Sequence, residues 1–299
     1  MAKKNPLRGL LVRSGAVRRP DLGFLLAGDP KQEAEEIPHA ITFRWQAGAF
    51  YQGSAKFGAF SICIIDDPEY GVVHVSGPGI YSVETRKGMT TGNIFNDSQP
   101  KPKEPRYGDI TAVAEIQQKA YAVGLEGMVY RLDALKRWTR MDDGLPQSFD
   151  IQAIHGFSAS DIYAAGRRGE LWHYSGRKWT KRDLPTNVTL TTVKCAGDGK
   201  VYIGGHEGIL IRGRTDAWET IEHEGTEDDI WDLEWFKGSL YVSTMTSVYR
   251  LNGDALEEVD FGKNAPKTCY HLSAAEGVLW SIGEKDVMSF DGADWQRIV

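Results

Sequence analysis

The chain has 299 residues, 41% hydrophobic and 25% charged, and this ordinary globular composition gives no indication of a disordered or fibrous protein. Its 35 basic and 41 acidic residues leave a net charge of -6, which argues against a nucleic-acid-binding surface. The length fits two ordinary domains or one large all-β domain.

The N-terminal segment predicts neither a signal peptide nor a membrane span. It is basic, but its apolar run at residues 10–12 is far too short for either. The three cysteines, an odd number, lie in apolar strand-like segments, which is typical of buried thiols in a reducing compartment rather than of a disulfide framework. We therefore expect a soluble, cytoplasmic protein without membrane contact.

The first third of the chain predicts two irregular units of short strands, at residues 1–59 and 60–107. Each contains an insert. Residues 29–37 are acidic and are expected to form a short helix or a mobile loop. Residues 85–107 contain Pro100, Pro102 and Pro105 with several lysines, and this composition predicts an irregular loop.

Residues 108–299 contain five regular repeats of about forty residues. An aromatic residue marks each repeat, and subtraction of the residue numbers gives intervals of 42, 39, 39 and 39 between Tyr121, Tyr163, Tyr202, Tyr241 and Trp280. Each repeat predicts four short strands separated by turns. One four-stranded antiparallel sheet cannot bury both its faces alone, so the repeats are expected to stack around an axis.

The sequence therefore predicts an all-β fold, a single β-propeller domain over residues 1–299 with four-stranded antiparallel blades. Five regular and two degenerate units make seven blades, and six is the alternative if the first segment is an elaboration. A G-x-x-G turn follows the second strand in three repeats, for example at residues 166–169. Glycine at both ends suits a turn in which the backbone visits positive φ.

Catalytic motifs are not recognisable in the sequence. Phosphate-binding, zinc-protease, calcium-loop and nucleophile-elbow patterns are missing, and the seven histidines are dispersed. The strand ends at residues 174–179 and 290–295 resemble the Asp-box of sialidase-type propellers in their glycine and tryptophan only. We expect a protein that is not an enzyme and has no cofactor or bound metal.

Alignment of the repeats places Asp232 and His271 at the same innermost-strand position of adjacent blades, where the first three repeats have Ala112, Ala153 and Thr192. Both are expected near the central channel. An acid and an imidazole there would either line the channel through hydrogen bonds or bind a small ligand.

A partner-binding surface is the stronger hypothesis. In a propeller, the turns after the second strands and the links between blades lie on the same side. The residues expected there are Arg167, Arg168, His206, Glu207, Glu224, Glu227, Asp228, Asp229, Trp231, Met245, Glu284 and Lys285. The acidic link at residues 222–229 would attract a partner with a basic surface, and tryptophan and arginine are enriched at interface hot spots.

Residues 161–166 and 200–205 resemble the broad WD40, YVTN and BNR-like propeller superfamily. The chain as a whole also resembles bacterial single-propeller immunity proteins found beside secreted toxins. These resemblances imply a non-enzymatic platform that binds one protein, a toxin or effector domain, and inhibits it by occlusion. The alternatives are a propeller that binds a carbohydrate or small molecule in its channel, with or without glycoside activity, and an assembly factor or scaffold.

Overall fold

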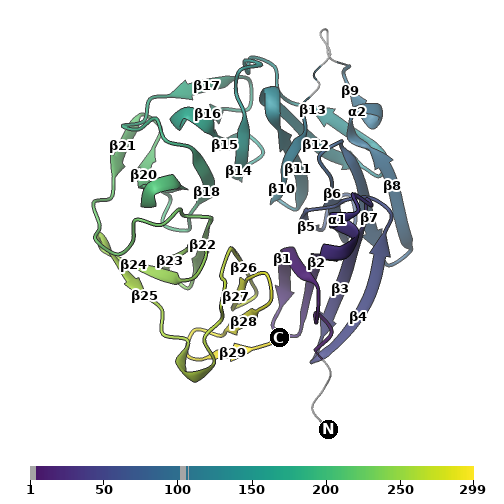
Figure 1. Ribbon diagram of the computed structural model, residues 1–299. Helices are drawn as coiled ribbons and strands as arrows, with labels where there is room; N and C mark the ends of the chain where they lie inside the picture. Colours follow the sequence, from purple (N-terminus) through teal and green to yellow (C-terminus); the bar gives the residue numbers. More distant parts are fainter. Residues whose placement is uncertain (1–4, 102–105, 107) are drawn as a thin grey trace. The chain divides into compact units, whose positions relative to one another are not determined.

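Seven antiparallel sheets make up the structure, a computed structural model that describes residues 5–101, 106 and 108–299 (Figure 1). Each sheet takes four strands in chain order, and one of them gains a short fifth strand at its edge. We number the sheets as blades 1 to 7 along the sequence. The fold is the predicted seven-bladed β-propeller, and the alternative of six blades is wrong because residues 11–55 form a complete blade.

The two blades of the first third are complete despite their irregular sequences. Blade 1 consists of β1 (Leu11–Arg19), β2 (Leu22–Gly28), β3 (Ala40–Gln46) and β4 (Ala49–Ala55), with α1 (Pro30–Ala34) between β2 and β3. Blade 2 consists of β5 (Ser61–Ile65), β6 (Gly71–Val75), β7 (Ile80–Thr85) and β8 (Gly88–Asn93). The acidic insert at residues 29–37 therefore contains a short helix, one of the two forms expected of it.

The prediction of an irregular loop at residues 85–107 is wrong for residues 88–99. This segment contains β8, then α2 (Ile94–Asp97), and then β9 (Ser98–Gln99), which pairs in parallel with the last strand of blade 3. Asn93 caps α2, since its side-chain oxygen accepts from the backbone N–H of Phe95 at 3.0 Å. Residues 102–105 and 107 of the predicted loop lie outside the described residues.

Blades 3 to 5 follow the regular repeat, and each has a 3₁₀ turn after its second strand. Blade 3 has β10 (Ile110–Ile116), β11 (Lys119–Gly124), η1 (Leu125–Gly127), β12 (Met128–Ala134) and β13 (Arg137–Arg140). Blade 4 has β14 (Ile151–Ser158), β15 (Asp161–Gly166), η2 (Arg167–Gly169), β16 (Leu171–Tyr174) and β17 (Trp179–Arg182). Blade 5 has β18 (Leu190–Cys195), β19 (Val201–Gly205), η3 (His206–Gly208), β20 (Leu210–Arg214) and β21 (Ala217–Thr220).

Blades 6 and 7 keep the four strands but replace the 3₁₀ turn. Blade 6 has β22 (Asp232–Phe236), β23 (Ser239–Ser243), β24 (Val248–Asn252) and β25 (Ala255–Glu258), which η4 (Gly262–Asn264) follows. Blade 7 has β26 (His271–Ala275), β27 (Val278–Ile282), β28 (Val287–Phe290) and β29 (Trp295–Arg297). The chain divides into two compact units, Met1–Phe60 with His223–Thr226 and Trp231–Val299 (unit 1), and Ser61–Glu222 with Glu227–Ile230 (unit 2).

The backbone of the G-x-x-G turn does visit positive φ, but its two glycines have different roles. Gly166 is extended, with φ of -167°, and is required because a Cβ there would lie 2.1 Å from the Asp150 carbonyl oxygen. Positive φ belongs instead to the last two turn residues, Arg168 at 61° and Gly169 at 66°. Arg168 is therefore in the left-handed region, a backbone conformation that β-branched residues rarely adopt.

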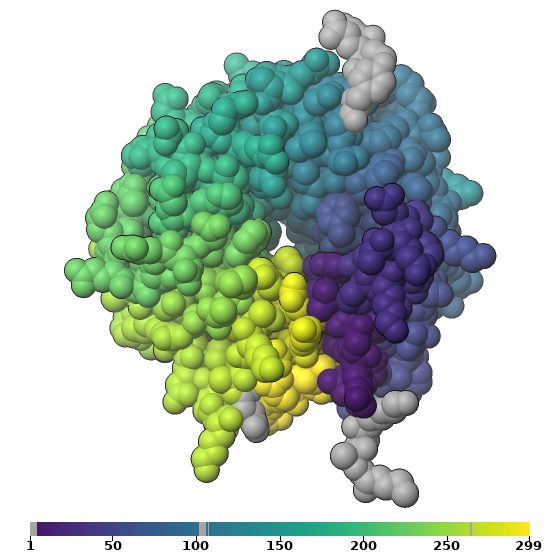
Figure 2. Space-filling model, in the orientation of Figure 1, coloured from purple at the N-terminus to yellow at the C-terminus, as the bar shows by residue number. Residues whose placement is uncertain are grey.

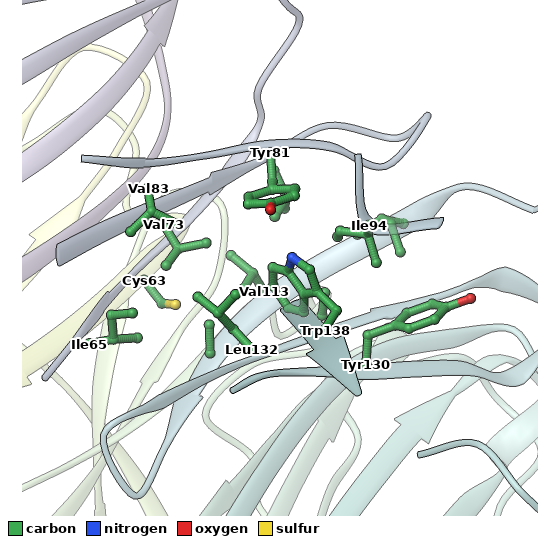
Figure 3. Close-up of a cluster of buried hydrophobic side chains, with 14 of the residues drawn as sticks. Cys63, Ile65, Val73, Tyr81, Val83, Ile94, Val113, Tyr130, Leu132 and Trp138 are labelled. Carbon is green, nitrogen blue, oxygen red and sulfur yellow. The ribbon is translucent and has the colours of Figure 1, made fainter. Parts of the chain in front are cut away.

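Within unit 2, blades pack face to face through large aromatic side chains. The ring of Tyr81 on β7 meets the ring of Trp138 on β13 edge to face, with the centroids 5.3 Å apart (Figure 3). Trp138 is fully buried, and aliphatic side chains of both blades surround it. Such packing buries the faces that a single sheet leaves exposed.

Within unit 1, the first blade packs against the last. Trp280 of β27 lies over Gly23 of β2, where a Cβ would be 2.2 Å from the ring, and its ring centroid is 5.5 Å from that of Trp45. The Val12 N–H also donates to the Glu284 carbonyl at 2.8 Å. The purple N-terminal strands and the yellow C-terminal blade are in direct contact in Figure 2.

Truncation of Trp280 should therefore destabilise the protein strongly. We expect Trp280→Ala to lower the free energy of unfolding by about 3–5 kcal/mol, because it removes a fully buried indole and leaves a cavity over Gly23. Urea unfolding followed by circular dichroism measures this. Trp231→Ala, at a tryptophan that is 39% exposed, is the control and should change stability much less. Equal losses in the two variants would contradict the packing described for blades 1 and 7.

A buried histidine gives the stability a pH dependence. Burial lowers the pKa of His74 from 6.5 to about 4, while Ser82 lies 3.2 Å from its Nδ1. Because the unfolded chain binds the proton first, the free energy of unfolding should fall as the pH drops from about 6.5 toward 4, by at most about 1.4 kcal/mol per pH unit from this group. His74→Asn should show a shallower slope in urea unfolding between these pH values, and an unchanged slope would contradict the assignment.

Candidate partner-binding surface

The turns after the second strands and the links between blades do lie at the same end of each blade. In blade 6, the first residue of β22, Asp232, pairs with the last residue of β23, Ser243. In blade 7, His271 at the start of β26 pairs with Ile282 at the end of β27. The link that precedes each blade and the turn that follows its second strand therefore emerge together, as predicted.

In unit 2 these turns expose charged side chains. Arg167 and Arg168 on η2 are both 58% exposed at their side chains. Arg167 lies 3.7 Å from the Asp150 carboxylate, and Arg168 lies 3.3 Å from that of Glu170 and donates to the Ser148 carbonyl. These contacts hold both arginines near the blade end while they remain in contact with solvent.

The acidic link is fastened to the turn of blade 5. The backbone N–H of Glu207 donates to the Asp229 carboxylate at 3.0 Å, and the Ile230 N–H donates to the Gly205 carbonyl at 2.9 Å. Glu227 and Asp228 are exposed beside this attachment. The structure thus brings four of the predicted residues of unit 2 together: His206 and Glu207 on η3, and Asp228 and Asp229 in the link. Glu227 is next to them in the chain.

In unit 1 the predicted residues Trp231 and Met245 are exposed apolar residues at the same end of blade 6. Trp231 is 39% and Met245 49% exposed. The Trp231 N–H donates to the Ser243 carbonyl at 2.8 Å, and the Met245 carbonyl accepts from the Cys269 N–H at 2.8 Å. Glu284 and Lys285 occupy the equivalent turn of blade 7, whereas Glu224 lies in the separate segment His223–Thr226 of this unit.

Asp232 and His271 are close together, as the repeat alignment predicts. The His271 Nδ1 lies 4.0 Å from the Asp232 carboxylate. This carboxylate also accepts from two backbone N–H groups, those of Leu233 at 2.8 Å and Leu272 at 3.0 Å. One oxygen therefore joins β22 to β26 through Leu272, and the other accepts within β22 from Leu233. That structural role is the simplest reading of the pair.

Sequence reasoning missed Tyr270. Its ring packs against that of Trp231 with the centroids 5.7 Å apart and the planes at 71°. Burial and then the negative charge of Glu284 raise the pKa of its hydroxyl. The alignment that pairs Asp232 with His271 also pairs Trp231 with Tyr270, so the repeat register contained the signal.

Other chemistry is not assembled in the described residues. Groups of three or more His, Cys, Asp or Glu side chains that could hold a metal ion are absent from them. Cys63, Cys195 and Cys269 are free and buried, and burial raises the pKa of Cys269 to about 11. No helix in the described part of the chain is long and apolar enough to span a membrane.

Comparison with solved structures establishes the class of protein. The chain superposes on the WD40 propeller domain of Doa1 (TM-score 0.65, 9% identity, 96% of this chain and 92% of that one). It is equally similar to U3-55K (TM-score 0.67, 9% identity, 92% and 89%) and to YCF48 bound to D1 peptide (TM-score 0.66, 14% identity, 94% and 91%). At these identities the likeness shows the fold alone: a WD40-like β-propeller.

Sequence comparison with curated proteins is more specific. No protein-family model matches the chain. It is, however, 37% identical to the immune protein Tsi7 of Pseudomonas aeruginosa strain PAO1, an alignment that covers 95% of this chain and 96% of that protein. The chain therefore belongs to the Tsi7 family of immune proteins.

The junction at Asp232 gives a test of the structural role of the pair. Asp232→Ala should lower the free energy of unfolding by about 1–3 kcal/mol, because it leaves the partly buried N–H of Leu272 without its acceptor. Asp294→Ala, at an exposed acid in the last hairpin, should change it by less than about 0.5 kcal/mol. Chemical denaturation of both variants measures the difference. If Asp232→Ala is as stable as Asp294→Ala, the Asp232 carboxylate does not join the two blades.

Proposed function

We propose that this chain is a non-enzymatic immunity protein that binds one protein toxin and neutralises it by covering its working surface. The observation that supports this most is the 37% identity to the immune protein Tsi7 along 95% of the chain. The alignment spans the whole propeller, and so includes both the scaffold and the turns that it presents. Free buried thiols agree with a cytoplasmic location for the protein.

Recognition is assigned to the blade ends that carry the turns and links, with the seven blades acting as one domain. Rigid strands there present short, charged turns, an arrangement suited to binding because the scaffold fixes the loops. A standard interface buries about 1,600 Å² in total, which several adjacent turns can supply. The acidic link and the net charge of -6 favour a toxin with a basic surface.

Protection of a sensitive cell tests the function. The tagged chain is used to capture its partner from the producing bacterium, and mass spectrometry identifies it. The identified protein is then expressed in a test strain with and without the chain. We expect growth arrest without it and normal growth with it. A partner that is harmless, or that stays fully active in the complex, would contradict immunity and indicate an assembly factor or scaffold.

Charge reversal in the acidic link tests the surface. We expect Glu224→Lys, Glu227→Lys and Asp228→Lys together to slow association with the toxin about tenfold or more at low salt, because electrostatic steering is lost. Surface plasmon resonance at low and high salt should also show a flatter salt dependence.

The matched control reverses the same number of charges in hairpins at the opposite ends of blades 6 and 7, with Asp254→Lys, Glu276→Lys and Asp294→Lys. Its net charge is identical, so a purely global electrostatic effect would slow both triple variants alike. If the link variant associates with the toxin as fast as the unmodified protein does, recognition lies elsewhere.

A further inference from the structure

Three aromatic or apolar residues lie at the same ends of blades 6 and 7 in unit 1: Trp231 and Tyr270, whose rings are in contact, and the exposed Met245. We call this the Trp231 patch. Trp231 precedes β22, Met245 follows β23, and Tyr270 precedes β26, so all three lie at the blade ends described above. Of the large hydrophobic side chains that are exposed in the described residues, Trp231 and Met245 are brought together in this way, whereas Ile37, Tyr51 and Met89 come from other blades.

The patch is held rigidly. Besides the hydrogen bonds that fix the backbone of Trp231 and Met245, the Ser243 hydroxyl donates to the Tyr270 carbonyl at 2.9 Å. The edge-to-face contact with Tyr270 then orients the indole of Trp231. A pre-positioned, partly exposed tryptophan loses little conformational entropy on binding, which is the property of an interface anchor.

Carboxylates border the patch. Asp232 is next to Trp231 in the chain, and its side chain accepts from the Leu272 N–H, two residues beyond Tyr270. Glu284 is close enough to Tyr270 to raise the pKa of its hydroxyl. Aromatic faces attract cations, and carboxylates strengthen that attraction, so the chemistry selects a positively charged group with an apolar stem.

Two neighbouring side chains that are positive or titratable, His271 and Lys285, oppose the binding of a cation. His271 follows Tyr270 in the chain; its ring centroid is 6.5 Å from that of Tyr270, and its Nδ1 is 4.0 Å from the Asp232 carboxylate. Lys285 is exposed on the same turn as Glu284. An exposed lysine is long and solvated and can move aside, whereas Asp232 is fixed by two backbone donors.

The chain itself shows the geometry that such a contact takes. The guanidinium of Arg44 lies over the Tyr51 ring at 4.6 Å, and that of Arg214 lies over the Phe157 ring at 3.9 Å. Both are arginine contacts with an aromatic face.

From these observations we infer that the Trp231 patch binds an arginine side chain of the protein partner, with the guanidinium against the indole of Trp231 and near Asp232 and Glu284. This inference rests on the proposed function, because it names the anchor through which the toxin is held. It adds a defined chemistry to the general preference for a basic partner.

A peptide titration tests the inference without the toxin. The probe is the acetylated and amidated tripeptide Gly-Arg-Gly, and the control is the same peptide with citrulline, the neutral isostere of arginine. The readout is the indole N–H resonance of Trp231 in the intact protein, assigned by its loss in Trp231→Phe. We expect a saturable shift with the arginine peptide, with a dissociation constant on the order of 10 mM.

Charge variants test whether the neighbouring charges change peptide affinity in the expected direction. Glu284→Gln should weaken peptide binding about threefold, and Lys285→Gln should leave it equal or tighter. The citrulline peptide should give no saturable shift. Equal shifts with both peptides, or none with either, would overturn the arginine assignment and would leave the immunity function unaffected.

The toxin provides the second arm. Once the partner is identified, Trp231→Ala should weaken its binding about 30-fold, as expected of an anchor. Tyr51→Ala is the matched control, because Tyr51 is also exposed, at 52%, but lies on the outer strand β4, and it should leave affinity unchanged. An unchanged affinity in Trp231→Ala overturns the inference even if the peptide binds. Failure of the chain to protect cells overturns the proposed function instead.

Discussion

Face-to-face packing of neighbouring sheets is the interaction on which this structure depends. A four-stranded sheet with apolar side chains on both faces cannot be stable alone in water, so each blade needs a neighbour. The aromatic residue of the second strand contributes to this contact in blades 3, 4, 6 and 7, and Tyr121, Tyr163 and Trp280 are entirely inaccessible to solvent. Because the inner strands carry the stability, the blade ends can vary in sequence and display charged turns.

The repeat made the fold predictable. A buried aromatic at an almost constant interval reflects a constant geometric demand, one contact per blade, and its spacing predicted the five regular blades. The count of seven also needed the two irregular units of the first third. Local propensity was less informative where tertiary packing decides. Residues 88–93 form β8 although Gly88 and Gly92 lie within them, because the exposed edge of blade 2 accepts any backbone that can pair with β7.

The site was only partly predictable for a related reason. Turn positions follow from topology, so the residues at the blade ends could be named from the sequence, and the proximity of Asp232 and His271 followed from repeat register. Exposure does not follow from register. Trp231 and Tyr270 occupy equivalent positions, yet Trp231 is exposed at 39% and Tyr270 is partly covered, because each meets a different neighbour. Which face of an aromatic ring stays exposed depends on side-chain packing, and the repeat spacing contains no information about that packing.

The contact between blades 1 and 7 joins segments from opposite ends of the chain: the Val17 N–H donates to the Ser273 hydroxyl at 3.0 Å, across 256 positions of sequence. During synthesis on the ribosome, the surface of blade 1 that covers Trp280 has no counterpart until the final blade has emerged. Blades 3 to 5, whose partners are adjacent in sequence, can pair long before. Late closure of this seam therefore leaves the apolar face of the nascent N-terminal blade exposed to water for most of synthesis.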